Sequence, residues 1–118
     1  MSERSSAVSL ILSELAYEFD SDIPRVTDLK IRRALRRRGL GFDPELVNRL
    51  RDLKNDLQSE LRRPEQSDYF LGYHGAYSSS QDFDVERLTA DCIRRYPQLP
   101  PTEIEHFVPF ALYLYSLR

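Results

Sequence analysis

The sequence has a single cysteine, Cys92, and only two histidines, His74 and His106. One cysteine cannot form an internal disulfide, which is typical of proteins from reducing compartments. The three residues also show none of the ligand spacings of a zinc site. We therefore expect Cys92 to pack in the core, the histidines to make ordinary hydrogen bonds, and the protein to hold no metal or other cofactor.

Glycine is scarce as well, with four residues in a chain of 118. The pair Gly39 and Gly41 lacks the spacing of a phosphate-binding loop, and no serine or cysteine stands in a motif that pairs it with an activating base. Acid pairs such as Glu103 and Glu105 occur at a predicted helix start, where favourable interaction with the helix dipole explains them. These absences predict a protein that is not an enzyme and has no catalytic residues.

Long apolar runs are missing too. The longest run, Phe107 to Tyr115, is far shorter than the stretch of about 20 residues that crosses a bilayer. The N-terminus shows no apolar segment followed by a cleavage site of the kind found in signal peptides. Together with the cysteine content, these features predict a cytoplasmic protein with no membrane segment.

The composition, with 41% hydrophobic and 31% charged residues, is that of an ordinary globular protein of single-domain size. Apolar residues recur at helical spacing in five segments. We therefore predict an all-α fold, with residues 1–118 forming a single compact domain of about five helices. A long aromatic-rich loop, residues 64–83, is expected between the third and fourth helices, and it is functional, disordered, or contains a short element that the pattern does not resolve.

The first helix is expected to follow a serine cap and to carry apolar residues over 8–19. The second is expected from about Asp28 to Arg38, with Thr27 or Asp28 as its N-terminal cap and Gly39 ending it in a left-handed conformation. The third begins at Asp43, where an Asp-Pro-Glu sequence is a strong helix start. It carries a seam of leucines: Leu46, Leu50, Leu53, Leu57 and Leu61.

The fourth helix is expected to start after Asp84 and to end at Pro97. A capping box at residues 102–105 predicts the start of the fifth. Pro109 predicts a kink there, or a short turn followed by a new helix. A strand over 110–117 is the alternative for this apolar segment.

Positive charge is concentrated in the middle of the chain. Residues 25–63 hold twelve basic and six acidic side chains, whereas residues 1–24 and 64–118 each carry a net charge of −4. Within the second predicted helix, most of the arginines fall opposite the apolar stripe of Ile31, Ala34 and Leu35. The basic cluster consists of Arg32, Arg33, Arg36, Arg37 and Arg38.

Two interpretations of this cluster remain open. The helix dipole and nearby acids, namely Glu14, Glu18, Asp20 and Asp22, would neutralise the arginines inside the molecule. Alternatively, the arginines face solvent and bind an anionic partner. In the second case we predict a non-catalytic binding or regulatory module for an acidic protein partner, because the acidic outer segments would repel nucleic acid.

Neighbouring aromatic residues are expected to join the binding surface: Tyr69, Phe70 and Tyr73. The alternative function is nucleic-acid binding, with the same arginines contacting phosphates from a helix-turn-helix-like segment, residues 28–63. Homo-oligomerisation through the leucine seam or the apolar C-terminal segment is a third option.

One stretch, LKIRRALRRRGLGFDPELVNRLRDLK at residues 29–54, resembles a single helical repeat of the RecX recombination regulators. The likeness consists of the basic helix, the glycine turn and the amphipathic helix that follows. It covers less than a quarter of the chain, and the rest departs from the repeated three-helix layout of that family. The resemblance therefore implies a local helical arrangement and assigns no role to any residue.

Overall fold

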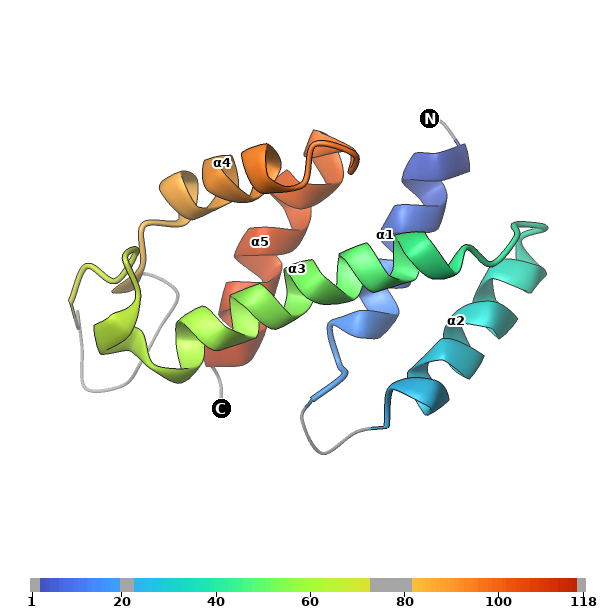
Figure 1. Ribbon diagram of the computed structural model, residues 1–118, viewed down its shortest axis with the longest axis horizontal. Coiled ribbons are helices and arrows are strands. Elements are labelled where there is room, and N and C mark those ends of the chain that lie inside the picture. The colour runs from blue at the N-terminus through green and yellow to red at the C-terminus, as the bar shows by residue number, and fades with distance from the viewer. Residues whose placement is uncertain (1–2, 20–22, 73–81, 117–118) are drawn as a thin grey trace. The chain divides into compact units, whose positions relative to one another are not determined.

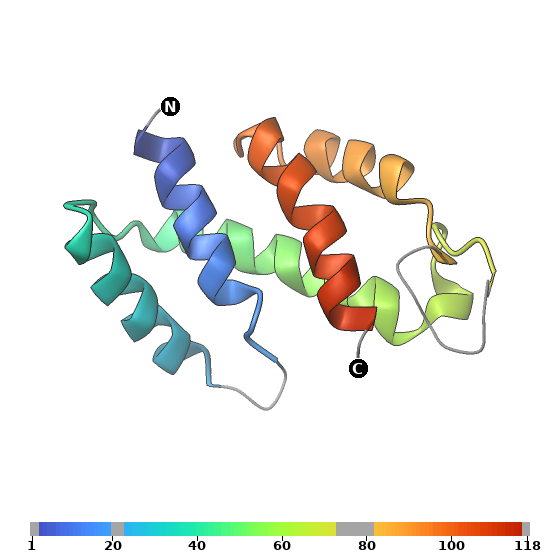
Figure 2. The same cartoon turned by 180° about the vertical axis from the view of Figure 1, so that it is seen from behind.

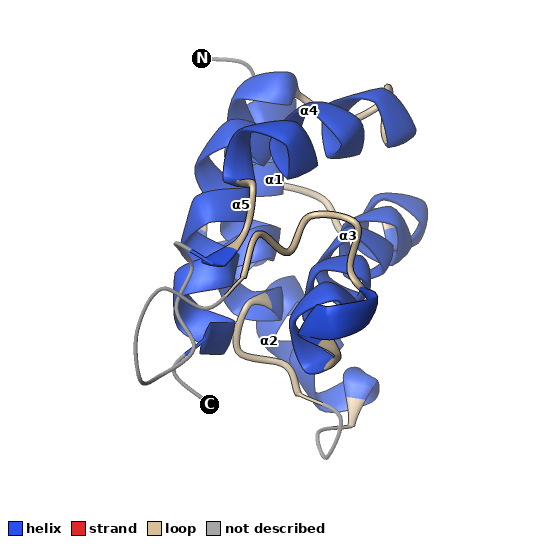
Figure 3. Cartoon of the chain, turned by 90° about the vertical axis from the view of Figure 1, so that its left-hand side faces the viewer, coloured by secondary structure: helices blue, strands red, loops and turns tan. Residues whose placement is uncertain are grey.

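The computed structural model describes residues 3–19, 23–72 and 82–116, and its regular structure in these ranges is helical (Figures 1 and 3). The elements are α1 (Glu3–Leu15), α2 (Pro24–Arg37), α3 (Pro44–Arg62), the 3-10 turn η1 (Pro64–Gln66), α4 (Val85–Arg95) and α5 (Pro101–Ser116). The all-α prediction with about five helices is confirmed. Within the described ranges, no helix combines the length and the apolar character needed to cross a membrane.

The contacts divide the chain into two compact units, Met1–Lys54 and Asn55–Arg118. The first unit contains α1, α2 and the first part of α3; the second contains the rest of α3, η1, α4 and α5. In the first unit, α1 and α2 pack side by side and run in opposite directions (Figures 1 and 2). Its buried apolar residues include Val8, Ile11, Leu12 and Leu15 on α1, Ile31 and Leu35 on α2, and Leu46, Val47, Leu50 and Leu53 on α3.

Helix α2 begins four residues earlier than the sequence pattern predicts. Pro24 occupies the first helical position, and Ile23 precedes it as an N-cap that makes no side-chain hydrogen bond. Proline suits this position because its φ angle is already helical and its missing N–H has no helical partner there. Thr27, predicted as a cap, instead lies buried within the helix.

Helix α3 begins where the sequence predicts. Asp43 Oδ1 accepts hydrogen bonds from the backbone N–H groups of Glu45 (3.1 Å) and Leu46 (3.3 Å), which satisfies donors that the first turn leaves free. The leucine seam is buried at Leu46, Leu50, Leu53 and Leu57 and half-buried at Leu61. The seam therefore belongs to the chain's own core and presents little surface to a second copy.

In the second unit, α4 and α5 pack against each other. Asp84 caps α4 as predicted, because its side chain accepts a hydrogen bond of 3.2 Å from Arg87 N. Helix α5 begins at Pro101, so Thr102 lies inside its first turn and does not precede the helix as the capping-box prediction required. The helix continues through Pro109, which is exposed, and the alternative of a C-terminal strand is wrong.

The segment expected as a loop contains short ordered elements at both ends. The turn η1 follows α3 directly, and Phe70 and Phe83 form an antiparallel bridge. Leu71 N donates to Asp82 O, and Asp84 N donates to Tyr69 O, both at 2.7 Å. The two ends of this segment are therefore joined by backbone hydrogen bonds, which sequence periodicity did not resolve.

Candidate partner-binding surface

The basic residues of α2 lie on its solvent side. The helix buries only a narrow stripe of Thr27, Ile31 and Leu35, spaced four residues apart. This periodicity turns the intervening positions outward. We call the exposed arginines of α2 and its C-cap the arginine face: Arg32, Arg33, Arg36, Arg37 and Arg38.

No carboxylate among the described residues forms an ion pair with the arginine face. Of the acids predicted to neutralise it, Glu18 binds other cations, and Asp20 and Asp22 lie outside the described residues. Glu14 is half-buried and forms no ion pair within the described ranges. The guanidinium groups of the arginine face are therefore available to a partner.

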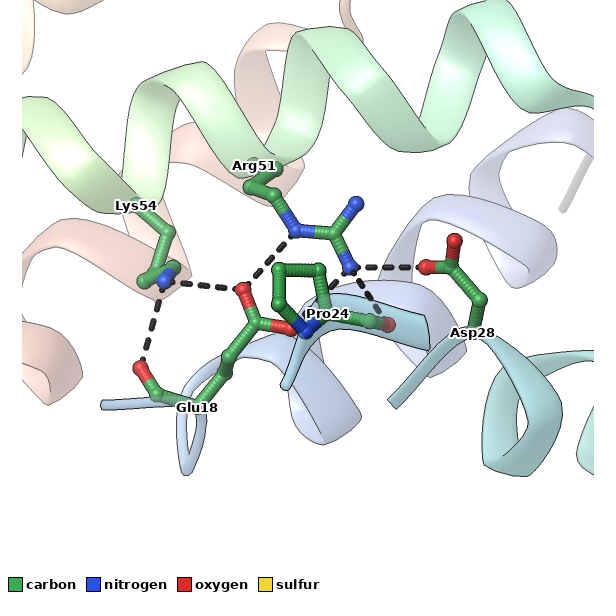
Figure 4. A network of polar contacts seen from close by, with 5 residues as sticks. All are labelled: Glu18, Pro24, Asp28, Arg51 and Lys54. Atoms are coloured by element: carbon green, nitrogen blue, oxygen red, sulfur yellow. Dashed lines mark hydrogen bonds and ion pairs between the residues drawn. The ribbon is translucent and has the colours of Figure 1, made fainter. Parts of the chain in front are cut away.

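The cations that the fold neutralises internally are on α3 instead. Arg51 Nε donates to Glu18 Oε1 at 2.8 Å, and Arg51 Nη2 donates to Glu18 Oε2 at 3.0 Å and to Asp28 Oδ1 at 2.7 Å (Figure 4). Lys54 Nζ donates to Glu18 Oε1 at 3.1 Å and to the Glu18 carbonyl at 3.2 Å. These contacts join the end of α1, the start of α2 and the middle of α3.

This network is almost free of solvent at its centre, where Glu18 is 4% and Lys54 3% exposed. Burial alone would raise the pKa of Glu18, but hydrogen bonds from Arg51, Thr27 and Lys54 and the charge of Lys54 lower it from 4.5 to about 2. The hydrogen bonds to Glu18 raise the pKa of Arg51. Glu18 and Arg51 are therefore charged at neutral pH, and the network joins the elements of the first unit without using the arginine face.

The C-terminal end of α2 has a well-defined geometry that orients Arg32. Gly39 adopts a left-handed φ of 70°, Gly39 N donates to Arg36 O at 3.0 Å, and Leu40 N donates to Leu35 O at 2.9 Å. This is the Schellman arrangement, which uses two carbonyls that the helix end leaves free. The chain then turns so that Arg32 lies over the Phe42 ring, 3.9 Å from its centroid.

The aromatic residues predicted to accompany the arginines belong to the second unit. Tyr69 is only 6% exposed, and its hydroxyl donates to Asp91 Oδ2 at 2.7 Å. Phe70 is half-buried, with its ring centroid 5.5 Å from that of Phe83. Tyr73 lies outside the described residues. Tyr69 and Phe70 therefore serve the packing of their own unit, and the candidate surface rests on the arginines.

The structure contains a pocket beside α2 that the sequence pattern did not predict. It has a volume of about 430 Å³ and lies in the first unit between α1 and α2. Its lining residues are Glu14, Tyr17, Glu18, Ile23, Val26, Thr27 and Lys30. Because the predicted helix began at Asp28, Val26 was not recognised as a helix residue, nor Ile23 as the residue that precedes the helix; a start at Pro24 would have placed both.

The described residues outside this surface offer little chemistry. No group of three or more histidine, cysteine or acidic side chains among them could hold a metal ion. Burial is the main cause that raises the pKa of the Cys92 thiol to about 11, so the thiol stays protonated and unreactive. The arginine face is accordingly the strongest candidate site in the described part of the chain.

Comparison with known proteins returns no relative. No protein-family model matches the sequence. Neither the curated proteins nor the solved structures contain a match.

Proposed function

We propose that this protein is a small non-catalytic binding or regulatory module whose arginine face recruits an acidic surface of another protein. One observation carries the proposal: the fold treats two sets of cations differently. Arg51 and Lys54 are paired with Glu18 inside the first unit, whereas the arginine face meets no carboxylate among the described residues. The buried carboxylate of Glu18 stabilises the fold, and the exposed arginines remain available for binding.

The energetics of α2 support a binding role. Arg32 and Arg36, like Arg33 and Arg37, are like-charge neighbours four residues apart, and each pair costs about 0.2–0.5 kcal/mol in a helix. Arg36 and Arg37 lie in the last turn, where the helix dipole stabilises each cation by about 0.3–1 kcal/mol. The free helix therefore tolerates the cluster, and a bound carboxylate surface would remove the remaining repulsion through bidentate pairs.

Two features favour a protein partner over nucleic acid. The chain is acidic overall, with a net charge of −2, and the exposed side of α3, the helix that follows the glycine turn, carries Glu45 and Asp52. Exposed apolar residues also lie at the N-terminal end of α2, namely Ile23 at the N-cap and Val26 and Leu29 within the helix. Apolar groups beside arginine are typical of protein interfaces, whereas contact with phosphates alone does not use them.

The proposal is tested by titrating the protein with three labelled probes in fluorescence anisotropy. The first is an alanine-rich helical peptide with a row of glutamates at helical spacing; the second is duplex DNA; the third is single-stranded RNA. Each titration is run at about 50 and about 200 mM salt, because phosphate contacts weaken steeply over that range. A double variant, Arg33→Ala with Arg37→Ala, is compared with a matched control, Arg49→Ala with Arg63→Ala, at exposed arginines outside α2.

We expect the glutamate peptide to bind wild type and the control, and to bind the α2 double variant at least about tenfold more weakly. Equal binding to all three proteins would reject the proposal. Binding of DNA or RNA that is stronger than peptide binding, steeply salt-dependent and lost in the α2 variant would replace the protein partner by nucleic acid.

A further inference from the structure

The outer surface of α2 changes character along the helix. Within the helix, Val26, Lys30, Arg33 and Arg37 follow one another at steps of three or four residues, and Ile23 is the N-cap that precedes them. Residues at this spacing share one side of a helix. The N-terminal end of this ridge is apolar, with Ile23 64% and Val26 49% exposed, and its C-terminal end is cationic.

The apolar end of the ridge forms a wall of the α1–α2 pocket. Ile23 and Val26 line it together with Tyr17, and its volume of about 430 Å³ lies in the range of ligand sites and holds a large aliphatic or aromatic side chain. Glu14 and Lys30 also line the pocket, and their opposite charges leave no net attraction for a charged group. With Ile23 and Val26 in its wall, the pocket suits an uncharged, apolar group.

The cationic end of the ridge lies at a defined distance from the pocket. At 1.5 Å per residue, Arg33 is about 10 Å and Arg37 about 16 Å along the axis from Val26. A partner helix that lies along α2 with an apolar side chain in the pocket would place its residues seven and eleven positions further along beside Arg33 and Arg37. Helical recognition motifs use such spacing, because these residues fall on one side of the ligand.

We propose that the partner segment is an acidic amphipathic helix that places an apolar side chain in the α1–α2 pocket and aligns carboxylates with Arg33 and Arg37. This inference rests on the proposed function and specifies its ligand. Charge complementarity identifies the occupant: the arginine end attracts carboxylates, whereas the opposite charges of Glu14 and Lys30 leave the pocket end with no net attraction for them. The ligand therefore has separate apolar and acidic ends.

The test uses two alanine-rich helical peptides of about 20 residues. The anchored peptide carries leucines at helical spacing near one end and glutamates at helical spacing near the other. The charge-only peptide has the same glutamates, with alanine replacing each leucine. Because alanine and leucine both favour helix, the two peptides differ mainly in the apolar anchor. Affinities are measured by fluorescence anisotropy for wild type and for the variants Val26→Asp, Ile23→Ser, Leu71→Asp and the Arg33→Ala, Arg37→Ala double variant.

We expect wild type to bind the anchored peptide about tenfold more tightly than the charge-only peptide, the effect of burying one aliphatic side chain. Val26→Asp and Ile23→Ser should each bring the anchored peptide close to the affinity of the charge-only peptide. The Arg33→Ala, Arg37→Ala double variant should bind both peptides more weakly than wild type does. Leu71→Asp, which changes an apolar residue of the second unit that is 62% exposed, should change neither affinity.

The outcomes separate this inference from the proposed function. Equal affinity of wild type for the two peptides overturns the pocket assignment. The same follows if Val26→Asp and Ile23→Ser both keep the full wild-type preference for the anchored peptide over the charge-only peptide. The recruitment proposal still stands in that case if the arginine variant weakens binding. Loss of arginine dependence for both peptides rejects both proposals. Circular dichroism and thermal unfolding of each variant confirm that a loss of binding does not come from a loss of fold.

Discussion

Replacing Glu18 with glutamine should destabilise the protein by about 3 kcal/mol at pH 7. The amide keeps the size of the side chain but removes the charge, which leaves Lys54, 3% exposed, without a carboxylate partner among the described residues. Breaking a buried ion pair from one side typically costs about 3–5 kcal/mol. The lower figure applies because Arg51 retains Asp28. The fall in the pKa of Glu18 from 4.5 to about 2 corresponds to a similar energy, about 3 kcal/mol.

The same contact predicts how stability depends on pH. The pKa of Glu18 is lower in the folded protein, about 2, than its ordinary value of 4.5, so the unfolded chain takes up the proton first on acidification. The stabilisation is therefore complete above about pH 5, falls as the pH drops below 4.5, and is lost near pH 2. Glutamine does not titrate, so wild type and Glu18→Gln should differ most at neutral pH and converge at about pH 2.

Urea unfolding followed by far-ultraviolet circular dichroism, repeated between about pH 7 and pH 2, measures both effects. A control variant, Glu105→Gln, changes an exposed carboxylate and should alter the free energy of unfolding by no more than about 0.5 kcal/mol. Unfolding of Glu18→Gln at the same urea concentration as wild type at pH 7 would contradict a stabilising role for the Glu18 carboxylate. A difference between the two proteins that is independent of pH would contradict it equally.

Three further results are expected. The Arg33→Ala, Arg37→Ala double variant should keep the free energy of unfolding within about 0.5 kcal/mol of wild type, because these side chains support no described contact; a larger loss in urea unfolding would show that they stabilise the fold. Gly39→Ala should cost about 1 kcal/mol in the same assay, because alanine is strained at a φ of 70° although space is open around it; an unchanged midpoint would contradict the left-handed turn. Cys92, buried and with its pKa raised to about 11, should react with a thiol reagent at pH 8 only after unfolding, so rapid labelling of the native protein would count against its burial.

Local sequence signals predicted most of the helices. Asp43 and Asp84 marked the starts of α3 and α4, because an aspartate before a helical pattern accepts the free backbone donors. Three helix starts were placed too late: α1 begins at Glu3, before the expected serine cap, α2 before Thr27 or Asp28, and α5 before Thr102. The last two share one cause. In each case a proline lies upstream and takes the first helical position, so the helix begins before the residue that resembles a cap.

The candidate site was predictable only in part. The 3.6-residue period was enough to place the arginines of α2 opposite Ile31 and Leu35. It could not show which acids meet which cations, because Glu18 and Arg51 are 33 residues apart in sequence and meet only through tertiary packing. The same limit applies to Tyr69, whose hydroxyl donates to Asp91, a partner 22 residues away in sequence.

The stacking of Arg32 on Phe42 has a consequence for the thermodynamics of recognition. Fixing a free arginine side chain costs up to about 2 kcal/mol of rotamer entropy, and Arg32 is already restrained in the unbound protein because the ring lies 3.9 Å from its guanidinium carbon. Phe42 thereby favours complex formation through preorganisation, although it carries no charge. In calorimetry, replacing Phe42 with leucine would therefore appear as a less favourable binding entropy.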